Sequence, residues 1–410
     1  MSDTTIENAL VAAAGRGGRA PATPRGLLDE FRPYHAHMRE QPTRARAGDQ
    51  TAGGPVIVTG LAQRQAWRAR AFPPVEQVTP GVWSVPVTIP DNPLRYTLCY
   101  LLLADSGAVV VDPGWDTDRG WADLQRGLAA AGVSPGRITG IVVTHVHPDH
   151  HGLSQRLSEA SGAWIAMHSA ELWYLPSRIG EVIGGADGFR SWLVRSGVPS
   201  DTEIFGDDED FRRMFSMAEP DRLLNDGDAL DLPGRRVKVV WTPGHTPGHI
   251  CLHDADHDLL LTGDHLLPRI SPNVGLTPVS GDSPLSSYLK SLQAMHRYAA
   301  AEALPAHEYR FRGIAERSDA LIEHHAVRAR EVLDIVAAAG QPTIWEVTQN
   351  LTWSRPWDQI TGYMRRAALA EAEAHIEYLE REGRLIIRRD SEHSPARLLA
   401  VPGDSRDAPR

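Results

Sequence analysis

Residues 142–153 read VVTHVHPDHHGL, and this stretch decides the fold because it places four histidines and an aspartate within seven positions behind a short apolar run. Side chains on a strand alternate between its two faces, so His145 and His147 point to the same side. The proline that follows predicts a turn, after which Asp149 and His150 point back from the start of a helix. Because zinc, iron and manganese all accept imidazole and carboxylate ligands, the stretch predicts a metal centre.

Further ligands are expected elsewhere in the chain. Four side chains from one turn could contact two metal ions, but they could not complete either coordination shell, since a two-metal site needs two terminal ligand sets and a bridge. The sequence offers three more candidates, namely His245 in VVWTPGHTPGH, Asp264 in LLLTGDH and His307 in LPAHE. Each follows a short, strand-like apolar run, and side chains at the ends of several strands can converge on one site.

The composition is that of an ordinary globular protein of 410 residues, with 42% hydrophobic and 23% charged residues. We find no apolar run as long as a membrane span and no secretory signal pattern, so we expect a cytoplasmic protein that makes no membrane contact. With only two cysteines, Cys99 and Cys251, a disulfide framework and a cysteine-based zinc site are excluded. The net charge of −10 argues against general affinity for nucleic acid or anionic membranes.

Three regions follow from the sequence pattern. Residues 1–75 are rich in Ala, Arg, Gly and Pro and form an N-terminal extension, with short amphipathic pieces at 6–14 and 27–37. Residues 76–315 alternate β-rich and helix-like runs, which indicates a layered α/β domain. Residues 316–402 form a separate module.

An insert at residues 169–222 interrupts the alternation of strands and helices. It is rich in large apolar side chains: Trp173, Tyr174, Trp192, Phe205, Phe211, Met214, Phe215 and Met217. Two interpretations are compatible with each other, a small helical cap with its own core and a lid that walls an apolar substrate pocket.

The C-terminal module shows helical periodicity over residues 315–340. Thr343, with Glu346 three residues later, predicts a capping box at the start of a second helix. A long helix is expected over 358–382, and residues 383–401 have the pattern of a two-stranded hairpin. Three helices followed by a hairpin suggest a winged-helix fold.

The motifs VVVDPG, THVHPDHHG, TPGHTPGH, LLTGDH and LPAHE resemble, in order, the five motifs of the metallo-β-lactamase fold. The resemblance covers about residues 80–310 and is greatest to the glyoxalase II branch with its related thioesterases and lactonases. It implies an αββα sandwich with a dinuclear metal site at one edge of its sheets. The C-terminal module resembles the winged-helix appendage of some members, including β-lactamase-like endoribonucleases.

Carried over position by position, the resemblance implies a role for each motif residue. His145, His147 and His245 would hold the first metal, Asp149, His150 and His307 the second, with Asp264 bridging and Asp112 orienting the ligands. The cofactors would be two divalent metal ions, with zinc as the first choice and iron or manganese as alternatives. The neighbouring histidines His151, His249 and His265 are interpreted as supporting or packing residues.

A mechanism follows from two metals. A hydroxide that bridges them would attack an electrophilic carbonyl or phosphorus, and a metal would stabilise the oxyanion. As a hypothesis, Asp149 is the catalytic residue that accepts the proton from the attacking water and passes it to the leaving group. The leading function is therefore a metal-dependent hydrolase of a thioester, ester or lactone. Its partner would be a small-molecule substrate with an apolar part, and a homo-oligomer is possible.

Two other functions stay open. One is a metal-dependent nuclease or phosphodiesterase with a winged-helix nucleic-acid grip, for which Arg365, Arg366, Arg388 and Arg389 are the candidate phosphate contacts. It is disfavoured because residues 319–400 carry more acids than bases. The other is an iron-dependent redox enzyme. No glutathione-binding residues are recognisable, and Arg310 and Arg312 are either contacts to an anionic substrate group or ordinary surface arginines.

Overall fold

The computed structural model describes residues 56–175, 185–204, 217–277, 280, 283–391 and 394–401. The amphipathic pieces expected at 6–14 and 27–37 lie outside these ranges, as do four of the large side chains of the insert. Those four are Phe205, Phe211, Met214 and Phe215. Among the described residues, no helix is both long and apolar enough to cross a membrane.

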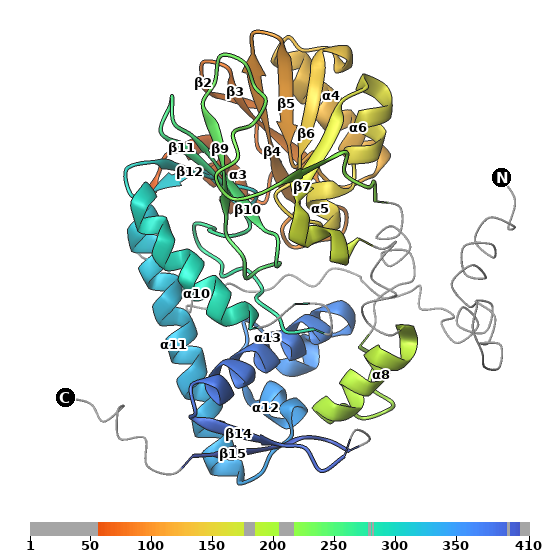
Figure 1. The fold of residues 1–410 in the computed structure, drawn as a ribbon, viewed down its shortest axis with the longest axis vertical. Helices are drawn as coiled ribbons and strands as arrows, with labels where there is room; N and C mark the ends of the chain where they lie inside the picture. Colours follow the sequence, from red (N-terminus) through yellow and green to blue (C-terminus); the bar gives the residue numbers. More distant parts are fainter. Residues whose placement is uncertain are drawn as a thin grey trace, which may run out of the picture. The chain divides into compact units, whose positions relative to one another are not determined.

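Two β-sheets form the body of the protein (Figure 1). The seven-stranded sheet has the order β2 (Glu76–Thr79), β3 (Val82–Thr88), β4 (Tyr96–Ala104), β5 (Gly107–Val111), β6 (Ile138–Val142), β7 (Trp164–His168) and β8 (Arg222–Leu224). The six-stranded sheet has the order β1 (Ile57–Val58), β13 (Phe311–Arg312), β12 (Glu302–Pro305), β11 (Leu259–Gly263), β10 (Ile250–Asp254) and β9 (Val237–Trp241). Strands β5 to β8 run parallel, as do β11 and β12, and the other pairs are antiparallel.

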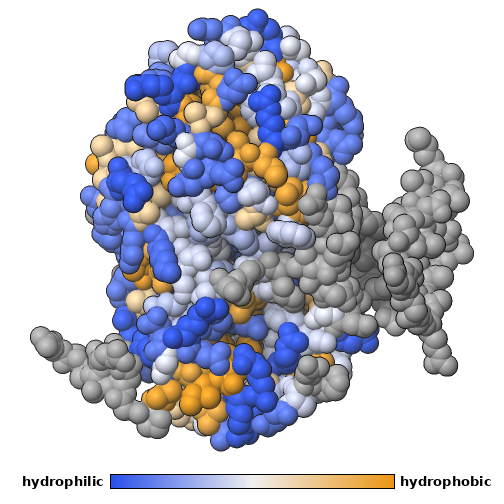
Figure 2. Space-filling view, viewed as in Figure 1, coloured by the Kyte–Doolittle hydropathy of each residue, from blue (hydrophilic) through white to orange (hydrophobic). Residues whose placement is uncertain are grey.

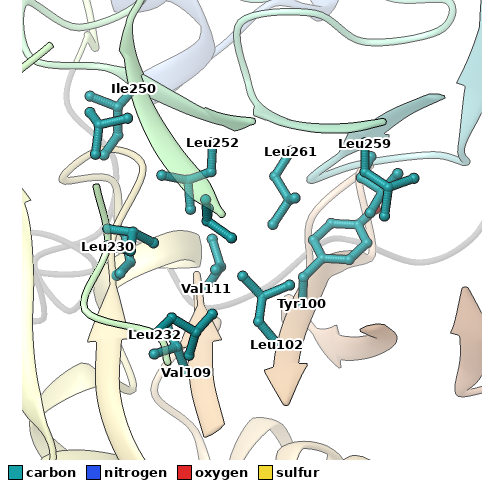
Figure 3. Packing of buried hydrophobic residues seen from close by; sticks show 14 of the residues in the cluster. Tyr100, Leu102, Val109, Val111, Leu230, Leu232, Ile250, Leu252, Leu259 and Leu261 are labelled. Atoms are coloured by element: carbon teal, nitrogen blue, oxygen red, sulfur yellow. The ribbon is translucent and has the colours of Figure 1, made fainter. Parts of the chain in front are cut away.

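The core between the sheets follows from strict alternation along the strands. On β4, Leu98, Tyr100 and Leu102 point to one face and pack against residues of the second sheet such as Leu252 and Leu261 (Figure 3). Successive side chains of a strand point to opposite faces, so the residues between them cover the outer face. Burying one leucine side chain completely stabilises the folded state by about 1.5–3 kcal/mol, because its apolar surface is removed from water.

Helices cover both outer faces. On the seven-stranded sheet, Cys99 and Leu101 pack with Leu124 and Leu128 of α4 (Asp118–Ala130). The same side carries the short 3₁₀ helix η1 (Pro135–Arg137) and the helices α5 (Pro148–His151) and α6 (Ser154–Ser161). The six-stranded sheet is covered by α10 (Pro284–Ala294), η3 (Met295–Tyr298) and the first part of α11 (Ile314–Ala339). The predicted αββα sandwich is confirmed.

The residues just before β2, which the sequence assigned to the N-terminal extension, contribute two elements to the body. Strand β1 pairs with β13 at the edge of the second sheet. Helix α3 (Leu61–Arg68) follows, and its buried Gln63 donates to Ser84 on β3.

The C-terminal module (residues 314–400) contains α11, α12 (Ile344–Asn350), the turn η4 (Trp357–Gln359), α13 (Gly362–Arg381) and the hairpin of β14 (Leu385–Arg388) with β15 (Arg397–Ala400). Three helices and a hairpin follow one another in the predicted order, and the capping box of Thr343 with Glu346 is present. The long helix begins at Gly362 rather than at 358, because residues 357–359 form the separate turn η4, where Trp357 packs edge-on against Trp345. The assignment as a winged helix stays a prediction.

Helix α8 (Gly185–Ser196), within the predicted insert, shares its core with this module. Trp192 is buried in one cluster with Ile344, Leu369 and Ile376. Its indole nitrogen donates to Glu373 of α13. The interpretation of the insert as a cap with a core of its own is therefore wrong for α8.

Candidate metal centre

The histidines and aspartates of the motifs meet at one edge of the two sheets. Asp112 follows β5, the HVHPDH turn follows β6, His245 follows β9, Asp264 follows β11 and His307 follows β12. The carboxyl ends of these strands carry turns whose side chains converge, so residues far apart in sequence become neighbours. All seven predicted metal ligands are brought together here.

Three ring nitrogens form the first group. His145 Nε2 lies 2.9 Å from His147 Nδ1 and 3.2 Å from His245 Nε2, and the last two atoms are 3.1 Å apart. Tetrahedral zinc with bonds of about 2.0–2.1 Å would hold its nitrogen ligands about 3.3 Å apart. The three nitrogens cannot all satisfy one another by hydrogen bonding, so their lone pairs suit a common cation.

Asp149, His150 and His307 form the second group. His307 Nε2 lies 3.3 Å from Asp149 Oδ2, and His150 Nε2 lies 3.7 Å from the same oxygen. Both nitrogens are buried and have no hydrogen-bond partner among the described residues. Because an unsatisfied buried polar atom is costly, these orphaned atoms indicate a ligand between them.

Asp264 lies between the two groups. Its Oδ2 is 3.7 Å from His245 Nε2 and 3.6 Å from His150 Nε2, and its Oδ1 is 3.2 Å from His307 Nε2. A carboxylate in this place could bridge two cations. The donor set of imidazoles and carboxylates, without sulfur, suits zinc, iron or manganese.

The charges of the site also suit cations. Burial alone would raise the pKa of Asp149, but His150 and His307 lower it to about 2. Burial would lower the pKa of His307, but Asp264 and Asp149 raise it to about 10. In the first group, burial lowers the pKa of His147 most and the neighbouring His245 lowers it next, to a value of about 3. The carboxylates therefore attract positive charge, which a proton on His307 supplies in the metal-free site and a bound cation would supply in its place. His147 presents a neutral ring, the form that binds metal.

A second layer of hydrogen bonds fixes the rings. His150 Nδ1 lies 2.8 Å from Asp112 Oδ2, and the same carboxylate accepts from the amide and hydroxyl of Thr144. His307 Nδ1 donates to the carbonyl of Tyr96 at 3.1 Å. A ring that donates through Nδ1 presents the lone pair of Nε2, and such partners orient metal ligands. The geometry of Asp112 agrees with the orienting role that the resemblance implied.

The three adjoining histidines support the site from behind. His249 Nε2 accepts from the amide of Asp264 at 3.1 Å, which fixes the backbone of that residue. His151 links Ser154 to the carbonyl of Ala218. His265 is fully buried, with its ring 5.2 Å from the ring of Tyr288.

Glu171 is a residue of this site that the sequence analysis missed. It lies in the turn η2 (Ser169–Tyr174), is fully buried, and accepts from the amide of Val146 at 2.7 Å and from the amide of Gly248 at 2.6 Å. One carboxylate thus joins the turn that carries His145 to the turn that carries His245. A side chain at Gly248 would collide with Glu171, which explains the second glycine of TPGHTPGH.

The two arginines after His307 have other partners. Arg310 is almost buried and pairs with Glu302 at 2.6 Å and with Glu76 at 3.2 Å. Arg312 donates to the carbonyl of Ala300. The guanidinium of Arg310 therefore stabilises the packing of β2 against β12, and the hypothesis that it contacts substrate is not supported.

Comparison with known proteins agrees with this architecture. The family model described as "Metallo-beta-lactamase superfamily" matches residues 92–307, more than half of the chain. The chain therefore belongs to the metallo-beta-lactamase superfamily. The match contains every residue of the two candidate metal groups.

Individual relatives share between about a quarter and a third of their residues with the chain over the matched stretches. The chain is 34% identical over 125 residues to the acyl-coenzyme A thioesterase MBLAC2 of Homo sapiens and 35% identical over 127 residues to that of Gallus gallus. These matches cover 30% of this chain but only 39% and 40% of the relatives' own length. A beta-lactamase-like protein 2 homolog from Caenorhabditis elegans is 24% identical over 315 residues, or 76% of this chain and 88% of the relative.

Two solved structures resemble the chain well beyond the matched region. A metallo-beta-lactamase family protein from Thermus thermophilus has a TM-score of 0.66 at 29% identity, covering 79% of this chain and all of that one. A beta-lactamase domain protein from Burkholderia ambifaria has a TM-score of 0.67 at 25% identity, covering 84% of this chain and 97% of that one.

Proposed function

We propose that the chain is a metal-dependent hydrolase that cleaves the thioester bond of a small acylated substrate, with two divalent metal ions bound by His145, His147, His245, Asp149, His150, His307 and Asp264. The convergence of two ligand groups on the shared carboxylate Asp264 is the observation that carries the proposal. Zinc is the first choice, and iron or manganese fit the same donors. An ester or lactone is the alternative substrate within this class.

The choice of a thioester rests on the relatives. Two proteins named acyl-coenzyme A thioesterase share about a third of their residues with this chain over the matched stretch. A thioester carbonyl is an electrophile that needs water, a proton acceptor and oxyanion stabilisation. The site offers candidates for each of these.

The roles of the protein groups follow from their charge and position. Bound divalent cations supply a water molecule that is activated at neutral pH and an electrophilic contact for the carbonyl oxygen. Asp149, ionised at neutral pH, accepts a proton from the attacking water and returns it to the departing thiolate, so that a carboxylic acid and a thiol are released. Asp112 and the Tyr96 carbonyl keep His150 and His307 in orientation.

The nucleic-acid alternative is weakened by the environment of α13. In a winged helix the third helix is the natural reader of a groove. Here the middle of α13 is buried on several sides, between the module core and the segment that follows Asp264. The buried residues are Ala368, Leu369, Ala370, Ala372, Ala374, His375, Ile376 and Leu379.

The test is a hydrolysis panel on metal-loaded protein with acyl-coenzyme A thioesters, lactones, aryl esters and a phosphodiester. We expect thioester turnover that falls at least about 100-fold in His147→Ala, because removing a ligand or its support costs metal and activity. His296→Ala is the matched control, since His296 is an exposed histidine paired with Asp319. Turnover of the phosphodiester alone would overturn the proposal in favour of the nuclease. Metal analysis of the purified protein separates zinc from the iron of a redox enzyme.

The role of Asp149 has its own variant. Asp149→Asn keeps the size of the side chain and removes its capacity to accept a proton. We expect bound metal to be retained at least in part and turnover to be largely lost. Full turnover with both metals bound would refute this role.

A further inference from the structure

His245 has an acceptor that comes from the segment after Asp264. Its Nδ1 donates to the carbonyl of Asn273 at 2.7 Å, which leaves the lone pair of Nε2 for the first nitrogen group. We call residues 265–277 the bracing segment. We propose that the C-terminal module helps to orient a ligand of the metal centre. Helices α11 and α13 hold the bracing segment in place, and the Asn273 carbonyl thereby fixes the ring of His245. This inference rests on the metal site of the proposed function.

The first attachment comes from α11. Arg317 is fully buried, and its guanidinium donates to the carbonyl of Leu267 at 2.7 Å and to the carbonyl of Ile270 at 2.8 Å. Glu308 accepts from the amide of Arg269 at 3.1 Å. A buried charge is expensive unless it is hydrogen-bonded, so Arg317 fixes this half of the segment firmly.

The second attachment comes from α13. The side-chain amide of Asn273 donates to Glu371 Oε2 and to the carbonyl of Ala367, each at 3.3 Å. The amide of Leu276 donates to the carbonyl of Ala370 at 2.9 Å. A Cβ atom built on Gly275 would lie 2.8 Å from that of Ala370, so the two backbones approach closely there. Asn273 thus contacts α13 through its side chain and His245 through its carbonyl.

Glu371 is itself held by α11, because Arg328 lies 3.7 Å from its carboxylate. Glu373, two residues further along α13, faces the opposite way and accepts from Trp192 and Ser196 of α8. The helix therefore carries two carboxylates in similar settings, of which only one contacts the bracing segment. This pair provides a matched comparison.

The consequence for His245 concerns its orientation and tautomer. A histidine ligand whose second nitrogen loses its acceptor can rotate and can place its proton on the metal-binding nitrogen. Loss of such a partner typically weakens metal binding by about 10–100-fold. Asn273 and Glu371 are thus positioning residues for the first nitrogen group, although α13 lies in the C-terminal module.

The experiment measures metal affinity directly. Metal-free full-length protein is titrated with Co²⁺ against a competing chelator, and the visible absorption of the bound ion reports the ligand geometry. Asn273→Ala, Glu371→Ala and the double variant are compared with Glu373→Ala. We expect both single variants to bind Co²⁺ at the first nitrogen group about 10-fold more weakly than the wild type, with an altered absorption spectrum. The double variant should be little worse than either single one, because both act through the same contact.

Glu373→Ala should lower stability without changing Co²⁺ affinity, and an equal loss of affinity there would overturn the proposal as general loosening. Wild-type affinity in Asn273→Ala and Glu371→Ala would also overturn it. Asn273 is an exposed side chain, so its variant keeps the test valid if Glu371→Ala does not fold. Failure of the wild-type protein to bind Co²⁺ would instead refute the proposed function.

Discussion

A single buried carboxylate, Glu171, joins the two turns that carry the first nitrogen group. Its two oxygens accept from the amides of Val146 and Gly248, and burial raises its pKa to about 7, against the lowering effect of its hydrogen bonds with these amides. Both amides would be left without an acceptor if the carboxylate were removed. At this scale one side chain therefore decides whether two distant turns meet.

We predict that Glu171→Gln lowers the free energy of unfolding by about 1–3 kcal/mol, because the amide group of glutamine presents a donor to a backbone donor in a buried place. Urea denaturation of the metal-free protein measures this. Glu159→Gln is the control, since Glu159 lies on the exposed side of α6 and accepts from Gln155. An unchanged unfolding midpoint for Glu171→Gln would show that the two turns are held by other contacts.

Which residues the sequence could identify depends on how local their signal is. The seven candidate ligands stand in short motifs at the ends of apolar runs, so pattern and resemblance found all of them. Glu171 and Asn273 have no such pattern. Glu171 contacts amides 25 and 77 positions away, and Asn273 acts through a main-chain carbonyl that every residue possesses. No side-chain pattern can identify an acceptor of that kind.

Among the secondary-structure elements, helix α8 shows that a buried face can be predicted without its packing partner. Its apolar side chains indicated a buried face, but the face does not say what covers it. The strands were more predictable, because β4 and β10 are short, mostly apolar runs that are buried on both faces of their sheets. The partner of α8 depends on chain segments about 150 to 200 positions away, which no local period encodes.

We predict that Trp192→Ala destabilises the protein by about 3–5 kcal/mol, since it removes a large side chain from the core of the C-terminal module. Trp173→Ala is the control, because Trp173 is 55% exposed and should cost far less. Chemical denaturation followed by circular dichroism compares the two variants. Equal losses would mean that α8 is not part of that core.

At the scale of the whole molecule, the C-terminal module and the two-sheet body are joined by buried polar side chains as well as by apolar ones. His325 of α11 and His375 of α13 are buried, with His325 Nδ1 3.0 Å from His375 Nε2. Burial is the largest cause that lowers the pKa of both, with the partner ring adding to it for His325 and with contributions from Arg328 and His324, and the pKa of His375 is lowered to about 4 in total. Tyr288 of α10 packs edge-on against His325. The pair therefore titrates only well below neutral pH.

This pair makes stability depend on pH in a defined direction. In the unfolded chain His375 binds a proton near pH 6.5, whereas in the folded protein it does so near pH 4. As the pH falls from 6.5 toward 4, the unfolded state binds more protons, so stability is lost. At pH 5 this amounts to about 2 kcal/mol for His375.

We predict that the stability difference between the wild type and His375→Gln shifts by about this amount in favour of the variant between pH 7.5 and pH 5. Comparing the difference removes the contributions of other groups, including Glu373, whose pKa is raised to about 7 by burial and which acts in the opposite direction. Urea midpoints at the two pH values provide the measurement. A difference that does not change with pH would mean that His375 is not buried in its neutral form.

The surface of the module also has an apolar region. Figure 2 shows hydrophobic side chains gathered at the end of the molecule that carries the hairpin β14–β15, where Ile386 is 53% exposed. An exposed apolar side chain on a short, two-stranded hairpin is a place where chains can associate. The oligomeric state that the sequence left open is therefore best measured on the full chain.

The pairing of α8 with the C-terminal module has a consequence for how the protein is made. A ribosome delivers Trp192 long before Leu398, the last fully buried residue of the same core, about 200 positions later. At about 5–20 residues per second, this core can be completed only roughly ten seconds or more after Trp192 is made. During that interval the nascent chain carries an uncovered apolar helix between two parts of a domain that is itself incomplete. A chaperone that binds nascent chains would find its target there, and a message cut short before α13 would yield a protein in which that helix is never fully covered.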